Sequence, residues 1–177
     1  MVIALIIIAA VIILILLVAA TKPKSFRIER SQVIGKSPQD IVKHVQNFHE
    51  WIKWSPWEKL DPALKRSYSG SNDGEGAIYE WDGNGKAGAG RMEITQVVWP
   101  EKVQIRLDFI RPFRSSNTVE FKFETRGETT NVVWAMYGPN SFMSKVMNVF
   151  MNMDKLIGKD FETGLQNLKS VSEGRGA

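Results

Sequence analysis

The sequence predicts an α+β fold: a curved antiparallel sheet of six or seven strands around a long C-terminal helix, with a transmembrane helix in front. Three observations carry this prediction. Residues 2–20 are all apolar, several segments between residues 25 and 137 alternate apolar and polar side chains, and residues 141–171 repeat apolar side chains every three or four positions. Alternation is typical of strands that bury one face, and the longer spacing is typical of a half-buried helix.

The first apolar segment predicts a membrane anchor. Residues 2–20 contain no charge, Gly or Pro. A helix of this length is about 28 Å long, close to the hydrocarbon thickness of a bilayer. A cleaved signal peptide is the alternative, because Val18-Ala19-Ala20 resembles a cleavage site. The segment is longer than a usual signal core and no Lys or Arg precedes it, which favours an uncleaved single-pass anchor over residues 1–21.

The rest of the chain, residues 22–177, is expected to form one domain. All 23 Lys and Arg and all 19 Asp and Glu follow residue 20, so the net charge of +4 belongs to this domain. Lys22, Lys24, Arg27 and Arg30 come first. By the positive-inside rule they place the domain in the cytoplasm, next to anionic lipid headgroups. A solvated strand start explains the same basic cluster equally well.

Composition excludes several functional classes. The basic residues are interspersed with acidic ones and form no dense patch, so we expect no nucleic-acid partner. The absence of Cys excludes disulfides, thiolate nucleophiles and Cys-ligated metals. His44 and His49 are five residues apart, which is the wrong spacing for one helical face, and no nucleophile–His–carboxylate set is present. We therefore expect no metal and no cofactor.

Alternating segments predict the sheet. In residues 103–109, Val, Ile, Leu and Phe alternate with Gln, Arg and Asp, so one face is apolar and the other polar. Turn dipeptides such as Asp73-Gly74 separate neighbouring segments. The expected strands are 25–34, 64–69, 77–81, 91–98, 103–109, 119–123 and 132–137.

Capping residues mark where helices begin. Ser37, followed by Pro, starts a helix after the first strand. Ser141 caps a single long helix that runs to residue 171. Gly158 and Gly164 lie inside this helix and cost about 1 kcal/mol each relative to Ala. They indicate either the close approach of a strand or a ligand, or a local kink.

A Trp-rich segment carries a family resemblance. Residues 51–58, Trp-Ile-Lys-Trp-Ser-Pro-Trp-Glu, resemble the WxxWSPW segment of membrane-tethered polyketide cyclase/dehydrase-like proteins in the START-like (SRPBCC) superfamily. Residues 68–70, 134–136 and 153–165 are similar to the same group, so the resemblance spans residues 25–172. It implies a helix-grip fold, in which a short helical pair follows the first strand and a cavity for apolar molecules lies between sheet and last helix. The superfamily hosts binding, cyclisation and co-chaperone roles, so the fold alone does not fix the function.

The expected cavity combines inward-facing sheet residues with the apolar stripe of the last helix. Aromatic and thioether side chains suit a flexible or flat apolar ligand. The alternative is that each of these residues simply fills the core. The candidates are Tyr79, Trp81, Leu107, Phe109, Phe121, Phe123, Trp134 and Met136 from the sheet, and Met147, Phe150, Met151 and Ile157 from the helix.

Two further features have a functional and a structural interpretation. Trp51, Trp54 and Trp57 are three residues apart and form either a lip over the cavity mouth or a packing plug, which we favour because Pro56 ends a helix there. Asp154 falls on the apolar stripe of the last helix, where a carboxylate is costly unless it is paired or protonated. It either contacts a ligand, and with Tyr79 or Trp81 nearby is then the only catalytic candidate set, or it bonds to a strand arginine or backbone N–H groups at the rim.

These features favour membrane-anchored binding of a hydrophobic small molecule or lipid, with transfer or sensing as its use. The bilayer and the apolar ligand are the expected partners. A cyclase or dehydratase-like enzyme is the alternative, and it would act without metal or nucleotide. A protein-binding module is the third, and an apolar surface patch without a cavity would favour it.

Overall fold

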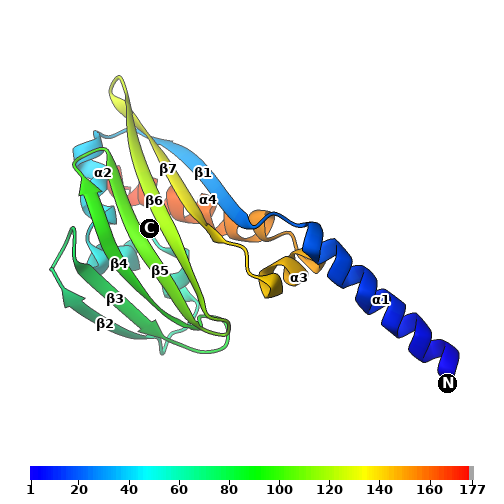
Figure 1. Cartoon of the computed structure of the whole chain (residues 1–177). Helices are drawn as coiled ribbons and strands as arrows, with labels where there is room; N and C mark the ends of the chain where they lie inside the picture. Colours follow the sequence, from blue (N-terminus) through cyan, green and yellow to red (C-terminus); the bar gives the residue numbers. More distant parts are fainter. Residues whose placement is uncertain (176–177) are drawn as a thin grey trace.

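The computed structural model describes residues 1–175; residues 176 and 177, the last two of the expected domain, lie outside the described residues. Helix α1 (Val2–Thr21) projects from the domain (Figure 1). Its mean hydropathy is 3.7, and it is long and apolar enough to cross a bilayer. A signal sequence near the N-terminus meets the same criteria of length and composition, so α1 is a membrane span or a signal sequence.

Seven strands form one antiparallel sheet in the order β1-β7-β6-β5-β4-β3-β2. This arrangement confirms the predicted α+β architecture. From β2 onward each strand pairs with its successor, and β7 then pairs with β1 at the edge. The strands are β1 (Ser25–Ile34), β2 (Lys65–Gly70), β3 (Ala77–Asp82), β4 (Ala89–Val98), β5 (Lys102–Arg111), β6 (Ser115–Arg126) and β7 (Thr129–Pro139).

Short helices connect the two edge strands, β1 and β2. They are α2 (Pro38–Val45) and the 3-10 helices η1 (Phe48–Lys53) and η2 (Pro56–Lys59). Ser37 caps α2 as predicted, because its side chain accepts a hydrogen bond from the Asp40 N–H. The Trp-rich segment therefore forms two tight helical turns that cover one end of the core.

The prediction of a single C-terminal helix is wrong. The chain forms α3 (Phe142–Phe150) and α4 (Met153–Ser172). Between them Met151 adopts an extended backbone, with φ −132° and ψ 133°. Asn152 Oδ1 then accepts the Lys155 N–H at 3.0 Å and caps α4. Asn is among the best N-cap residues, and the apolar periodicity that continues across it concealed this signal.

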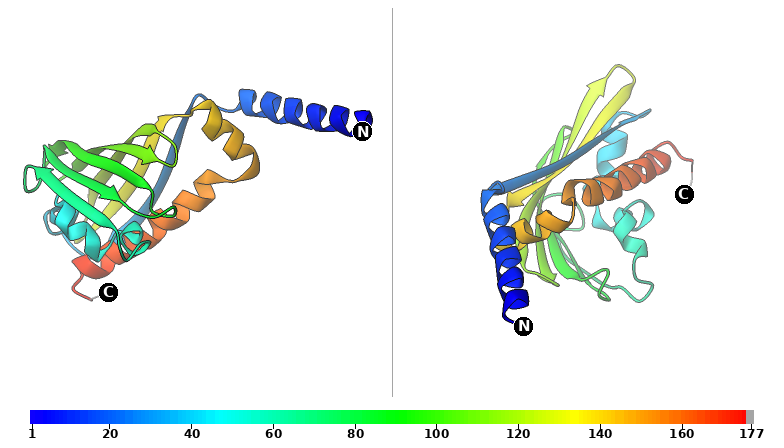
Figure 2. Two further views of the ribbon diagram at one scale, coloured as in Figure 1. Left: turned by 90° about the horizontal axis from the view of Figure 1, so that it is seen from below. Right: turned by 90° about the vertical axis from the view of Figure 1, so that its right-hand side faces the viewer.

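Helix α4 crosses the open side of the curved sheet and closes the core (Figure 2). Its buried side chains are Phe161, Leu165 and Leu168. An added Cβ at Gly158 would collide with the guanidinium of Arg30, and one at Gly164 would lie 2.7 Å from Cζ3 of Trp134. The two glycines therefore mark the close approach of strand side chains to an unbroken helix.

The other face of the sheet is polar. Ion pairs join neighbouring side chains along and across the strands, with Arg106–Asp108 at 2.9 Å and Arg27–Glu120 at 3.6 Å. Arg27 also lies over the Tyr137 ring, 5.1 Å from its centroid. The sheet therefore has one apolar face, and the site lies on it.

Candidate functional site

An apolar cavity of about 260 Å³ lies between the sheet, the η helices and α4. Strands β3 to β7 each contribute to its wall, and Ile157 and Phe161 of α4 close the opposite side. Cavities that hold drug-sized ligands are about 300–1,000 Å³. This cavity therefore matches a small apolar molecule or a single acyl chain of a larger lipid.

The strand register explains the width of the cavity on the sheet side. Leu107 of β5 is opposite Met92 of β4, and both line the wall. In the next inward-facing row, Gly90 separates Trp81 from Phe109. A Cβ at Gly90 would collide with the Trp81 ring. Glycine here lets the indole lie over β4 and meet Phe109 edge-on, with 6.0 Å between ring centroids.

An aromatic cluster forms the inner end of the cavity around Trp134. The Trp134 ring stacks on Phe161 at 4.3 Å and on Phe121 at 4.8 Å, and Trp57 meets it edge-on at 5.5 Å. These contacts join β7, β6, α4 and η2 at one point. The Trp134 Nε1–H is buried without a hydrogen-bond partner among residues 1–175, whereas a buried Trp N–H usually has one.

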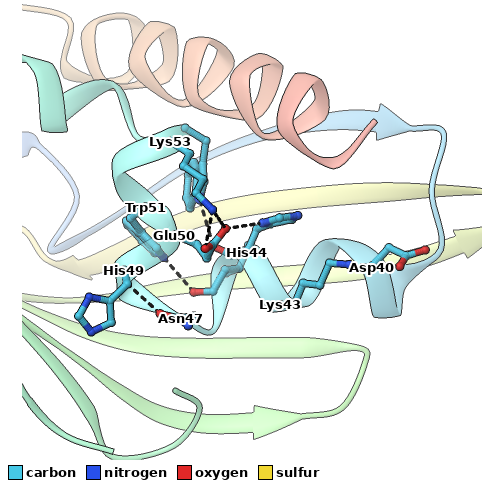
Figure 3. Close-up of polar contacts among 10 residues, drawn as sticks. Asp40, Lys43, His44, Asn47, His49, Glu50, Trp51 and Lys53 are labelled. Carbon is cyan, nitrogen blue, oxygen red and sulfur yellow. Dashed lines mark hydrogen bonds and ion pairs between the residues drawn. The ribbon is translucent and has the colours of Figure 1, made fainter. Parts of the chain in front are cut away.

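Helix η1 is held in place by polar contacts at the end of α2 (Figure 3). The Trp51 Nε1–H donates to the Val45 carbonyl at 2.9 Å. Glu50 accepts from Lys53 at 2.6 Å and contacts His44 Nδ1 at 3.0 Å. The Lys53 hydrogen bond lowers the pKa of Glu50 below its usual value, and the burial that opposes it is the smaller effect. Trp51 is thereby fixed with its ring against the cavity.

A buried polar group interrupts the apolar wall. Glu58 has a side chain that is 7% exposed. Its Oε1 accepts the Tyr79 hydroxyl at 2.6 Å and its Oε2 accepts Arg66 Nε at 2.6 Å. Burial, followed by the hydrogen bond to Glu58, raises the pKa of Tyr79 far above its usual value. The same carboxylate raises the pKa of Arg66, so Tyr79 stays protonated and Arg66 stays charged.

This polar group offers a ligand a defined kind of contact. Because the Tyr79 hydroxyl donates its one hydrogen bond to Glu58, its oxygen presents only lone pairs to the cavity. A ligand hydroxyl or amide N–H would complement it. Among residues 1–175, no three His, Cys, Asp or Glu side chains gather closely enough to hold a metal ion.

The opening is marked by those lining residues that are exposed: Leu60, Lys86, Arg111 and Pro112. Hydrogen bonds fix the loops that carry them. Asp61 Oδ2 accepts the Asn84 N–H at 2.7 Å, which ties the loop after η2 to the β3–β4 turn. The Trp81 Nε1–H donates to the Ala87 carbonyl at 3.0 Å, which holds the same turn over the sheet.

The structure brings many of the predicted residues together at this cavity. Phe121 and Phe123 do not line it and are corrections to the prediction, because they are at most 4% exposed and lie in the core beside it. Trp54 is 1% exposed and packs in the same core, which agrees with the favoured interpretation of the Trp residues as a packing plug. Alternation identifies the inner face of a strand, but not the point along it where packing leaves a gap. The predicted residues that line the cavity are Tyr79, Trp81, Leu107, Phe109, Trp134, Met136 and Ile157, together with Trp51 and Trp57.

Three predicted helix residues lie elsewhere. Met147 and Phe150 belong to α3 and Met151 follows it, and none of them lines the cavity. Phe150 is 67% exposed and Met151 45% exposed. Because the helix breaks after Phe150, the apolar stripe of α3 turns away from the sheet. Placing these residues in the cavity was wrong.

Asp154 is also outside the cavity. It lies in the first turn of α4 with its side chain 59% exposed, and it pairs with Arg30 at 3.1 Å. Arg30 pairs with Glu162 at 2.8 Å as well. The hydrogen bonds to Asp154 and then to Glu162 raise the pKa of Arg30. The interpretation of Asp154 as a ligand contact is therefore corrected, and the alternative of a bond to a strand arginine matches the structure.

Sequence reasoning missed the role of Glu58 and Arg66. Glu58 ends the Trp-rich segment, but nothing local distinguishes it from a solvated carboxylate. It meets Tyr79 only because η2 lies against the sheet where β2 pairs with β3. A contact between residues 21 positions apart leaves no periodic signal in a single sequence.

Residues 25–173 match the family model described as polyketide cyclase / dehydrase and lipid transport. The chain belongs to this family. The match covers the whole sheet, the cavity and α4, and it confirms the resemblance found in the Trp-rich segment. No curated protein sequence matches the chain.

Solved structures show the same fold at low sequence identity. The Aha1 dimer from Colwellia psychrerythraea has a TM-score of 0.60 at 15% identity, covering 84% of this chain and 96% of that one. A Staphylococcus aureus protein of unknown function has a TM-score of 0.62 at 12% identity, covering 85% and 95%. The di-domain ARO/CYC StfQ of the steffimycin biosynthetic pathway has a TM-score of 0.60 at 10% identity, covering 85% of this chain and 51% of StfQ. These likenesses establish the helix-grip fold.

Proposed function

We propose that this family member is a membrane-anchored binding protein for a hydrophobic small molecule or lipid, held between the sheet and α4. The observation that carries the proposal is the cavity of about 260 Å³ with its largely aromatic and aliphatic wall. Apolar area buried there contributes about 25 cal/mol per Å² before the costs of binding. Transfer and sensing are two uses of such binding, and both require the same cavity.

The N-terminal helix supports the membrane part of the proposal. Helix α1 is a 20-residue apolar helix, and among residues 1–175 it is the one helix long and apolar enough to span a bilayer. Lys22 and Lys24 follow it directly, so the positive-inside rule places the domain in the cytoplasm. Protease digestion of sealed, right-side-out cells tests this: a cytoplasmic domain stays intact until the membrane is permeabilised.

The buried polar group restricts the ligand. Tyr79 and Glu58 form one hydrogen-bonded unit in an otherwise apolar wall. A purely hydrocarbon ligand would leave the Tyr79 oxygen without a second partner, whereas a ligand hydroxyl would satisfy it. The proposed ligand is therefore apolar with one hydrogen-bond donor. Tyr79→Phe should weaken the binding of such a ligand more than it weakens the binding of its methyl ether.

Native mass spectrometry of the full chain tests the binding function. The protein is purified in detergent, exposed to a membrane lipid extract and measured for bound species of defined mass. Leu107→Trp places an indole in the cavity, because Leu107 lines the wall and is 8% exposed. Val98→Trp is the matched control, since Val98 is 39% exposed at the end of β4 and outside the wall.

We expect the wild type and Val98→Trp to carry the bound species and Leu107→Trp to lose it. Thermal unfolding of the three proteins shows whether each is folded. A wild type that stays free of ligand throughout would reject the binding function. Equal occupancy in folded Leu107→Trp would place the ligand outside this cavity.

A cyclase or dehydratase-like enzyme is the second candidate, and the buried Glu58–Tyr79 pair is the observation that favours it. Buried acid and base groups in an otherwise apolar cavity are the groups that proton-transfer chemistry needs. Incubation with a hydroxyl-bearing polyketide-like probe separates the two functions. Binding returns the probe with its mass unchanged, whereas dehydration returns a product lighter by one water, and Glu58→Gln should abolish its formation.

A further inference from the structure

Helix α3 presents an apolar surface that the domain does not cover. None of its residues is buried, and Phe142, Met143 and Phe150 are each more than half exposed. The helix is nevertheless well defined, because Ser141 Oγ accepts the Ser144 N–H at 3.1 Å at its start. Contiguous apolar surfaces of this kind mark interaction sites.

The position of α3 relates it to the membrane helix. Helix α3 packs against α1, whose Ala19 is fully buried (Figures 1 and 2). The Asn140 N–H donates to the Lys24 carbonyl at 2.8 Å, and Asn140 Nδ2 donates to the Pro23 carbonyl at 3.2 Å. The start of α3 is therefore tied to Pro23 and Lys24, just after the end of α1. If α1 spans the bilayer, α3 lies where the chain leaves it.

The cavity opens at the same end of the sheet. Ser25 at the start of β1 is opposite Pro139 at the end of β7. Following the antiparallel pairs across the sheet, this end also holds the β5–β6 turn and the β3–β4 turn (Figure 1). Phe113 of the β5–β6 turn is 55% exposed. Apolar side chains from α3 and from the β5–β6 turn thus lie at the same end of the sheet as the cavity opening.

Basic residues surround these apolar side chains. Lys22 and Lys24 precede β1, Arg114 precedes β6, Lys145 is on α3, and Lys86 is at the opening. None of these five side chains forms an ion pair with a described residue. Apolar residues flanked by unpaired basic groups fit an anionic bilayer surface, where the apolar groups enter the headgroup region and the charges meet phosphates.

We infer that α3 and the β5–β6 turn rest in the headgroup region of an anionic bilayer, so that the cavity opens directly onto the membrane surface. This inference rests on the proposed function and adds the path by which the ligand reaches the cavity. The ligand passes between bilayer and cavity without crossing bulk water. The opening residues Lys86 and Arg111 then lie beside the headgroups of the lipids from which it is drawn.

The chain has no Cys, so single-cysteine variants of the full protein report one position each. Phe150→Cys and Phe113→Cys place an NBD fluorophore on the inferred surface. Glu128→Cys is the control, because Glu128 is exposed in the β6–β7 turn at the other end of the sheet. Each protein is reconstituted in vesicles of phosphatidylcholine and phosphatidylserine that contain a headgroup-region nitroxide lipid. The readout is quenching of the fluorophore by that lipid.

We expect strong lipid quenching at positions 150 and 113 and none at 128. Equal, weak quenching at all three positions would overturn the inference. A fluorophore at 150 that is shielded from aqueous iodide yet not quenched by the lipid would also overturn it, since a protein partner or second copy would then cover α3. The double substitution Arg114→Glu/Lys145→Glu should lower quenching at 150. Arg126→Glu, at the distant end of β6, should leave it unchanged.

The two readouts test the two proposals separately: lipid quenching tests the membrane contact of α3, and ligand occupancy tests the binding function. Quenching at position 150 without bound ligand in the mass spectrum would reject the proposed binding function and support the contact of α3 with the membrane. Bound ligand in detergent without quenching in vesicles would reject the membrane contact and leave the binding function supported. In a protein with both, Phe150→Asp should retain occupancy in detergent and slow the uptake of ligand from vesicles.

Discussion

Helices α3 and α4 differ in what covers their apolar side chains, although the sequence gives both the same spacing of apolar residues. Helix α4 buries Phe161, Leu165 and Leu168, whereas α3 buries none of its residues. Helix α4 also has two glycines that let Arg30 and Trp134 approach it closely, and α3 has none. Apolar periodicity therefore predicts a helix but not which helix the sheet covers, and the closest contacts with strand side chains occur at the two glycines of α4.

The largest expected difference between the two helices comes from a matched pair of alanine substitutions. Phe161 is 1% exposed and stacked on Trp134, so Phe161→Ala should lower the free energy of unfolding by about 3–5 kcal/mol. Phe150 is 67% exposed, so Phe150→Ala should change it by about 0.5 kcal/mol or less. Denaturant unfolding of the full chain in detergent, followed by Trp fluorescence, measures both. Equal losses would mean that α3 belongs to the core.

The second prediction concerns whether replacing a glycine in α4 raises or lowers the free energy of unfolding. Helix propensity alone favours Gly164→Ala by about 1 kcal/mol. Because the new Cβ would lie 2.7 Å from Trp134 Cζ3 and 3.1 Å from Pro56 Cδ, we expect a loss of about 1–3 kcal/mol instead. Thr163→Ala, at an exposed position of the same helix, is the control and should be near neutral. A stabilised Gly164→Ala would show that α4 can move away from the sheet.

Much of this fold could be predicted because local signals agree with it. Alternation and turn residues predict a sheet of six or seven strands, and the structure has seven. Ser37 and Ser141 predict the start of two helices. The break at Asn152 was missed because apolar residues keep their spacing on both sides of it. The Glu58–Tyr79 contact was missed for another reason: it depends on how η2 lies against the sheet, and tertiary packing of this kind leaves no periodic pattern.

The third prediction tests whether the first turn of α4 contributes to the site. Asp154→Asn removes the negative charge beside Arg30 but leaves an amide oxygen, and Arg30 keeps Glu162 at 2.8 Å and the Glu29 carbonyl at 2.7 Å. The pair is largely exposed, so we expect a loss of about 0.2–1 kcal/mol in unfolding free energy. Ligand occupancy in the native mass spectrum should not change. A loss of ligand occupancy without a loss of stability would instead support the interpretation of Asp154 as a ligand contact.

The smallest expected effect is a pH dependence of the unfolding free energy, which we expect from the end of α4 and not from α3. Glu173, which follows α4, accepts the Gly35 N–H at 2.8 Å, and this hydrogen bond lowers its pKa below the usual value. The folded pKa is thus below the unfolded one, so the stabilisation is present above the usual glutamate pKa of about 4.3 and is lost as the pH falls through the folded value. Helix α3 has no Asp or Glu and contributes nothing comparable.

Glu173→Gln measures this contribution directly. The difference in unfolding free energy between wild type and Glu173→Gln should be largest near neutral pH and shrink on acidification below about pH 4. Denaturant unfolding at a series of pH values gives the difference. A difference that stays constant with pH would mean that the Gly35 contact stabilises equally through either protonation state. The attachment of α4 to the end of β1 would then not depend on the charge of Glu173, and its contrast with α3 would be one of burial and not of charge.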